Sequence, residues 1–202
     1  MNNRLVGLFV AGAMAALLAV PALAALVPGA TAPDFTATAS QAGKDFTFSL
    51  KQALAKGPVV VYFFPAAYTG GCDLEAHTFA QEKAKFVKAG ATIIGVSEDS
   101  VARLNEFSSD PKYCAGKFAV VSDPGGKIAA QYGVKRFPPQ KGVIDVRGQP
   151  VTHGFFARTT FVLNREGNVV KVLSSEADHL TPVQHVTESL ASVENLQANR
   201  AP

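Results

Sequence analysis

The positions of hydrophobic and polar residues predict the strands of this chain. Residues 34–50 alternate around a turn at Ala42-Gly43, which predicts a β-hairpin near the N-terminal end. Residues 59–64 and 91–96 are continuous apolar runs, as in central strands that are covered on both faces. The apolar positions of the hairpin are Phe35, Phe46, Phe48 and Leu50.

Helical spacing of apolar residues begins after the first central run. It continues from Cys72 to Lys88, and Gly90 just beyond is a typical helix end. Near the C-terminal end, Thr181 can cap a helix that has Pro182 at its first position. Shorter helices are predicted at residues 51–56, 100–107 and 127–132. The apolar positions are Leu74, Phe79, Phe86 and Val87 in the long helix, and Val183, Val186, Leu190 and Val193 in the last one.

The remaining pattern completes an α/β order of elements. Residues 118–121 form a short apolar run before a strong turn signal, and residues 159–163 and 168–173 flank the turn of a second hairpin. The pattern of residues 134–156 gives the weakest indication of secondary structure, and only 143–146 favours a small strand. The order predicts one three-layer α/β domain with a mixed central sheet, flanking helices and an N-terminal β-hairpin.

Composition changes this picture mainly at the N-terminus. The chain is 48% hydrophobic, but a positive start ending at Arg4, an uncharged apolar stretch over 5–20 and the small residues of Ala22-Leu23-Ala24 are typical of a secretory signal. We expect a signal peptide over residues 1–24, a mature domain over 25–202, and a periplasmic or secreted protein without stable membrane insertion after cleavage. A retained membrane anchor is the alternative, and Pro21 with the alanine-rich flank favours cleavage.

Charge excludes two classes of partner. The formal net charge of +3 becomes +2 once Arg4 is removed with the signal, and the positive residues form no run. A nucleic-acid-binding role and a polybasic membrane role therefore have no support.

Cys72 and Cys114 are the two cysteines of the chain. In an exported protein the plain expectation is a structural disulfide, whose loop of about 43 residues would stabilise the fold by roughly 4 kcal/mol. The position of Cys72 suggests a second reading, because it opens the long predicted helix. Unpaired backbone N–H groups and the helix dipole at that end favour the thiolate, which is the reactive form.

The residues around Cys72 carry a motif. Pro65, Thr69 and Cys72 are spaced as Pro-x-x-x-Thr-x-x-Cys between an apolar strand and a helix, and Glu75 and Phe79 extend it as Cys-x-x-Glu-Ala-x-x-Phe. This stretch resembles the peroxiredoxins, which are thiol peroxidases on a thioredoxin-like fold, and is most similar to their Q branch, the bacterioferritin-comigratory type. The resemblance runs from residues 32–35 to 158–163 and is weakest over 134–157, which looks like an insertion.

The resemblance implies roles for individual residues. Cys72 would be the nucleophile toward hydrogen peroxide or small organic hydroperoxides. Its backbone N–H and the Thr69 hydroxyl would position the peroxide, Arg158 would favour the thiolate and polarise the peroxide, and Pro65 would shield the sulfur from bulk water. Taken singly, Thr69 is a helix cap, Pro65 a strand terminator, Arg158 a surface charge and Glu75 a first-turn dipole partner. The arginines that could replace Arg158 are Arg103, Arg136, Arg147 and Arg165.

The oxidised sulfur must then be recycled. Many relatives in this branch carry a resolving Cys five residues after the nucleophile, where this chain has His77. The resemblance therefore implies that Cys114, in the predicted loop 108–117, resolves the Cys72 sulfenic acid as an intramolecular disulfide, after both segments move. The alternative is a one-Cys enzyme that uses an external thiol, with Cys114 as a bystander.

Two other functions compete with the thiol peroxidase. An exported thiol-disulfide oxidoreductase of thioredoxin-like fold needs Cys-x-x-Cys, and Thr69 stands where the first of those cysteines would be. A non-enzymatic domain with a permanent disulfide explains two cysteines but not the placement of Pro65 and Thr69 before Cys72.

The chemistry implies no cofactor, because sulfur does the redox work. The four histidines lack zinc-like spacing and are expected at the surface or at helix ends: His77, His153, His179 and His185. The expected partners are the peroxide and a thioredoxin-like reductant protein or small thiol, and the expected state is a monomer or weak dimer.

Overall fold

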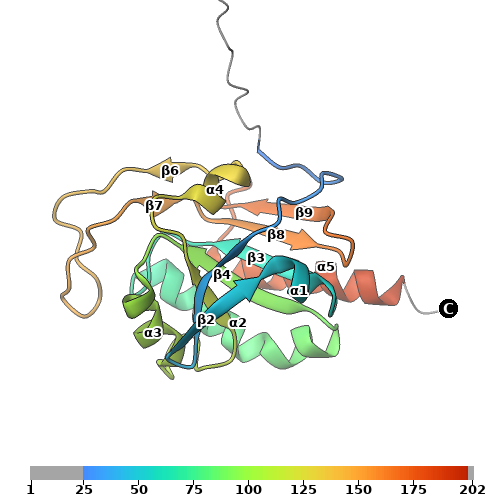
Figure 1. Ribbon diagram of the computed structural model, residues 1–202, viewed down its shortest axis with the longest axis horizontal. Coiled ribbons are helices and arrows are strands. Elements are labelled where there is room, and N and C mark those ends of the chain that lie inside the picture. Colours follow the sequence, from blue (N-terminus) through green and yellow to red (C-terminus); the bar gives the residue numbers. More distant parts are fainter. Residues whose placement is uncertain (1–24, 200–202) are drawn as a thin grey trace, which may run out of the picture.

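A seven-stranded mixed sheet forms the centre of the computed structural model, which describes residues 25–199 (Figure 1). The strand order is β2-β1-β5-β4-β3-β8-β9, in which β3, β4 and β5 are parallel and their outer neighbours antiparallel. The strands are β1 (Thr36–Gln41), β2 (Lys44–Ser49), β3 (Val59–Phe63), β4 (Thr92–Ser97), β5 (Ala119–Ser122), β8 (Thr159–Leu163) and β9 (Val169–Ser174). The signal peptide expected at residues 1–24 lies outside the described residues.

Helices cover both faces of the sheet and complete the three layers. They are α1 (Leu50–Leu54), α2 (Gly70–Lys88), α3 (Val101–Ser109), α4 (Lys127–Gln131) and α5 (Pro182–Ala198). Strand β3 explains the arrangement, because its residues are buried on both sides. Val60 and Tyr62 pack with residues of α2, α3 and α5, whereas Val61 and Phe63 pack with residues of α1 and α4. The predicted mixed α/β fold is confirmed.

The predicted hairpins and caps also form. Ala42 and Gly43 both have positive φ, as a two-residue hairpin turn between β1 and β2 requires. Thr181 caps α5 in a capping box with Gln184, and Pro182 opens the helix.

Some apolar positions of the predicted elements are exposed. Leu74 and Val87 of α2 are 47% and 58% exposed. Successive helical residues are turned by about 100°, so neither lies on the face that carries the fully buried Phe79 and Phe86. Phe46, on the edge strand β2, is 42% exposed. Val183 of α5 is also exposed.

Segment 134–157 differs most from expectation. The small strand expected at 143–146 does not form, and Ile144 makes only an isolated bridge to Pro150. Instead β6 (Arg136–Phe137) pairs antiparallel with β7 (Phe155–Phe156) as a separate two-stranded sheet. The backbone N–H groups of Arg147 and Gln149 donate to the buried carboxylate of Asp145, which holds the turn between the two strands. Within residues 25–199, no helix is both long and apolar enough to cross a bilayer.

Candidate active site

Cys72 lies in the first turn of α2, where β3 gives way to a turn and then to the helix. Thr69 is the cap residue, and the Cys72 side chain is only 2% exposed. The Cys72 N–H donates to the Thr69 carbonyl at 2.8 Å, and the Thr69 hydroxyl donates to the Ala66 carbonyl at 2.7 Å. Both groups expected to hold a peroxide therefore have internal partners in this structure.

Arg158 is the arginine that reaches the sulfur. Its Nη2 lies 3.3 Å from the Cys72 Sγ, and its Nη1 forms an ion pair with the buried carboxylate of Glu75. Gly71 leaves room for this contact, since a Cβ there would lie 3.2 Å from Arg158 Nη2. The other candidate arginines are engaged elsewhere: Arg103 and Arg147 with Asp145, Arg136 with Glu98 and Arg165 with the Ala55 carbonyl.

Glu75 has a larger part than the sequence suggested. The sequence predicts a dipole partner at the helix end, but the Glu75 side chain is fully buried and holds the Arg158 guanidinium beside Cys72. Burial raises the pKa of Glu75 to about 7, while Arg158 acts to lower it. The pKa of Arg158 is raised despite burial, because Glu75 and Cys72 both favour the cation. The sequence signal was the spacing of three residues, which places Glu75 near Cys72 on the helix surface.

Burial opposes the thiolate at Cys72. It raises the pKa of the thiol, and the lowering effects of Arg158 and of the nearby polar groups of Ala66 and Thr69 only partly offset it. This direction is opposite to the one expected from a helix end alone, because a charge in this closed site has lost its hydration. The guanidinium of Arg158 is therefore the main group that makes a thiolate accessible.

A cavity of about 580 Å³ opens beside these residues. Pro65, Thr69 and Arg158 line one side. The other side includes Phe137, Val143, Phe155 and Phe156 of segment 134–157. The segment that looked like an insertion is thus a wall of the candidate site, which no local pattern in it indicated.

A buried ionic cluster ties the Cys72 loop to the same segment. Asp99, two residues after β4, accepts from the Ala67 N–H at 2.8 Å, and Arg103 donates to the Ala67 carbonyl at 2.8 Å. Asp99 also contacts His153 Nε2 at 2.8 Å, while His153 Nδ1 lies 2.7 Å from the Gly154 carbonyl. Both partners of the ring are acceptors, so the imidazolium fits this site, and the pKa of His153 is raised by Asp99 although burial lowers it.

A second histidine, His185 in the first turn of α5, is not at the surface. His185 is fully buried between the hydroxyl groups of Thr160 and Ser175, at 2.9 and 3.0 Å. Burial, with Arg158 nearby, lowers the pKa of His185 to about 4. No group of three or more side chains suited to a metal ion occurs within the described part of the chain.

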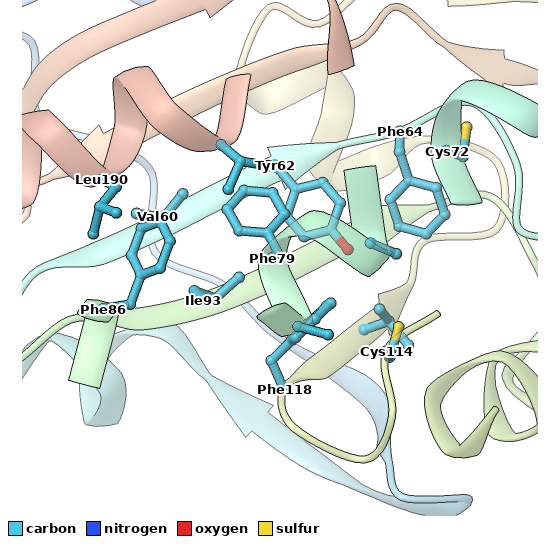
Figure 2. Close-up of a cluster of buried hydrophobic side chains, with 14 of the residues drawn as sticks. Val60, Tyr62, Phe64, Cys72, Phe79, Phe86, Ile93, Cys114, Phe118 and Leu190 are labelled. Carbon is cyan, nitrogen blue, oxygen red and sulfur yellow. The ribbon is translucent and has the colours of Figure 1, made fainter. Parts of the chain in front are cut away.

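Cys114 lies in the turn after α3 and is free, like Cys72 (Figure 2). Both side chains belong to the same buried cluster, and Cys114 is 0% exposed, so the turn that carries it, within the predicted loop 108–117, is packed into the core. Burial, together with Asp110 and Asp73, raises the pKa of Cys114 well above its ordinary value. His77, where a nearer cysteine could have stood, lies with its Nδ1 2.9 Å from the Lys112 carbonyl of the Cys114 turn.

The chain is similar to known proteins along most of its length. The profile of the AhpC/TSA family matches residues 28–172. A putative peroxiredoxin of Mycobacterium tuberculosis is 33% identical over 149 residues, which cover 74% of this chain and 86% of the relative. The chloroplastic peroxiredoxin Q of Oryza sativa subsp. japonica is 33% identical over 168 residues, covering 83% of this chain and 67% of that protein.

Solved structures agree with these relatives. The peroxidoxin BcpB of Mycobacterium tuberculosis superposes with a TM-score of 0.67 at 29% identity, covering 85% of this chain and 98% of that one. Peroxiredoxin Q of Xanthomonas campestris superposes with a TM-score of 0.59 at 27% identity, covering 79% and 90%.

Proposed function

The chain belongs to the AhpC/TSA family and is a peroxiredoxin-type thiol peroxidase, and we propose that it reduces hydrogen peroxide and small organic hydroperoxides through a sulfenic acid on Cys72. The contact between Arg158 Nη2 and the Cys72 Sγ carries this proposal. A guanidinium held by a buried carboxylate supplies positive charge where a thiolate must form and where the departing oxygen becomes negative.

The remaining site residues suit the first step. The Cys72 thiolate attacks one peroxide oxygen, the O–O bond breaks, and water or an alcohol leaves once it has gained a proton. The Thr69 hydroxyl donates to Ala66, so its oxygen keeps lone pairs that can accept from the peroxide O–H. Pro65 lines the cavity and limits contact of the sulfur with bulk water.

The cavity supports organic hydroperoxides as substrates. Its volume of about 580 Å³ exceeds what hydrogen peroxide needs, and Phe137, Val143 and Phe155 supply apolar surface for an alkyl group. Peroxide consumption with a small dithiol as reductant tests the activity, with Cys72→Ser as the comparison. Equal consumption by both proteins would refute the proposal.

Resolution by Cys114 is the second part of the proposal. Cys114 is a free thiol in the same buried cluster as Cys72, and a disulfide between them requires both segments to rearrange from their packed positions. Mass spectrometry after one equivalent of hydrogen peroxide distinguishes the alternatives. An intramolecular disulfide is expected, whereas a persistent Cys72 sulfenic acid with free Cys114 would indicate a one-Cys enzyme that uses an external thiol.

The cellular setting completes the proposal. The leader pattern of residues 1–24 supports export to the periplasm or secretion, where a thioredoxin-like protein would reduce the disulfide. We propose a monomer or weak dimer. Cell fractionation tests export, and size-exclusion chromatography with light scattering tests the oligomeric state.

A further inference from the structure

Asp73 is a buried carboxylate that the first step does not use. It follows Cys72 in the first turn of α2 and is 8% exposed, and its Oδ1 is buried without a hydrogen-bond partner. The helix dipole favours a negative charge at this end of α2. It does not explain why the Asp73 Oδ1 is buried away from solvent without a hydrogen-bond partner.

The packing of α2 places Asp73 toward the Cys114 turn. His77 lies one helical turn further along the same face, and its ring contacts the Lys112 carbonyl at 2.9 Å. Further along α2, the Ala80 carbonyl accepts from Lys117 Nζ at 3.0 Å. The negative charge of Asp73 raises the pKa of both Tyr113 and Cys114. Asp73 is thus next to Cys72 in the chain and one helical turn before His77, which contacts the Cys114 turn.

The Cys114 thiol needs a base before it can react. It is fully buried, and its raised pKa keeps it protonated at neutral pH, whereas only a thiolate attacks a sulfenic acid efficiently. Burial raises the pKa of Asp73 to about 6, and the backbone N–H groups of Tyr68 and Thr69 act to lower it. Asp73 is therefore ionised at pH 7 and more basic than an exposed aspartate, as proton transfer near neutral pH requires.

We propose that Asp73 transfers the proton in the resolving step, an inference that rests on the proposed Cys72–Cys114 disulfide. The Asp73 carboxylate takes the proton of Cys114 as its sulfur attacks the sulfenic sulfur of Cys72. The S–S bond forms, the S–O bond breaks, and the carboxylic acid returns the proton to the leaving hydroxide. One thiol and one sulfenic acid give one disulfide and one water, without a further oxidant or reductant.

Adjacency in the chain keeps the carboxylate in place for this step. The two sulfurs meet only after local rearrangement, and Asp73 moves with Cys72 because the two residues are neighbours. A purely electrostatic role would have the opposite effect on rate. Removing a negative charge near Cys114 lowers the pKa of the thiol and would speed resolution, whereas removing a base slows it.

The test compares Asp73→Asn with Asp110→Asn in the full chain. Asp110 also raises the pKa of Cys114, and asparagine keeps an acceptor for the Lys112 N–H that Asp110 binds at 2.9 Å. Each reduced protein is mixed with one equivalent of hydrogen peroxide and quenched over time, and sulfenic acid and disulfide are measured by mass spectrometry. We expect Asp73→Asn to form the disulfide at least about 10-fold more slowly with sulfenic acid accumulating, and Asp110→Asn to be no slower than wild type.

The pH dependence of wild type gives a second readout that needs no variant. Its conversion of sulfenic acid to disulfide should rise between pH 5 and pH 7 as Asp73 ionises and then level off, whereas Asp73→Asn should be slower and should keep rising above pH 7 with the Cys114 thiolate population. The other titratable groups facing Asp73 are present in both proteins: Asp110 and Tyr113 of the Cys114 turn, Asp145 of segment 134–157 and His77 of α2.

The outcomes separate this inference from the proposed function. A wild type that forms the disulfide, with Asp73→Asn equally fast or faster, would overturn the role of Asp73 alone, as would a wild-type rate that is flat between pH 5 and pH 7. A wild type that consumes peroxide but forms no Cys72–Cys114 disulfide would overturn the resolving step and the role of Asp73 together. The rate of sulfenic acid formation in the same samples shows whether each variant is folded at the site.

Discussion

Replacing Arg158 with methionine tests the electrostatics of the first step. The substitution removes the guanidinium 3.3 Å from the Cys72 Sγ and keeps a long apolar side chain. At an effective dielectric constant of about 20, a full positive charge at this distance stabilises a thiolate by about 5 kcal/mol. Without Arg158 the buried Glu75 carboxylate, whose pKa burial raises to about 7, should take up a proton, and the loss of its repulsion offsets about half of this, leaving about 2.5 kcal/mol.

This magnitude converts directly into rate. Because the pKa of Cys72 is already raised by burial, the thiolate is the minor form at pH 7. Arg158→Met should therefore oxidise about 70-fold more slowly at that pH. The loss should shrink at high pH, where the thiolate is populated without help from Arg158.

The assay follows loss of the Cys72 thiol by rapid quenching, alkylation and mass spectrometry in a Cys114→Ser background. Arg136→Met is the matched control, because Arg136 also pairs with a buried carboxylate, that of Glu98, at 2.6 Å. The control should stay within about twofold of its parent, since no contact joins Arg136 to the sulfur. Oxidation of Arg158→Met within about threefold of its parent at pH 7 would refute the electrostatic reasoning.

Three further predictions follow from single contacts. Thr69→Val should slow Cys72 oxidation about 10-fold through loss of one hydroxyl, while Thr69→Ser should keep most of the rate, as rapid-quench kinetics can show. Gly95→Ala should lower the free energy of unfolding by about 1 to 3 kcal/mol in urea titrations, because the new Cβ would lie 2.7 Å from Tyr62 Cζ; an unchanged midpoint would contradict that clash. The raised pKa of His153 predicts that its contact with Asp99 stabilises the fold fully below about pH 6.5 and that this contribution disappears as pH rises through the folded-state value. The free energies of unfolding of wild type and His153→Gln should therefore converge at alkaline pH. A difference that stays constant with pH would show that His153 is not protonated in the folded protein.

Local signals in the sequence predicted most elements correctly. The β3 run, the turn before Cys72 and the cap at Thr181 each depend on residues within a few positions of one another, which is why strand, helix entrance and capping box form as expected. The prediction failed for segment 134–157 because its pairing is not local. Strands β6 and β7 are separated by about 20 residues whose hydrophobic pattern has no period.

The residues of the candidate site also fall into those that the sequence indicated and those that only the structure showed. The motif around Cys72 pointed to Pro65 and Thr69, and resemblance added Arg158, which the structure places beside the sulfur. Neither showed that Glu75 is buried against Arg158, 83 residues away, or that His153 meets Asp99. Burial is a property of the packed chain, so the raised pKa of Cys72 also had no signal in its neighbours.

The sequence alone thus determined the order of strands and helices, the presence of a thiol at a helix entrance and the membership of a family. These follow from short-range periodicity and from residue types at fixed spacing. The tertiary structure decided which charges face Cys72, what closes its cavity and which carboxylate lies toward Cys114. These depend on contacts between residues far apart in the chain, whose energies appear only when the segments are packed and water is removed.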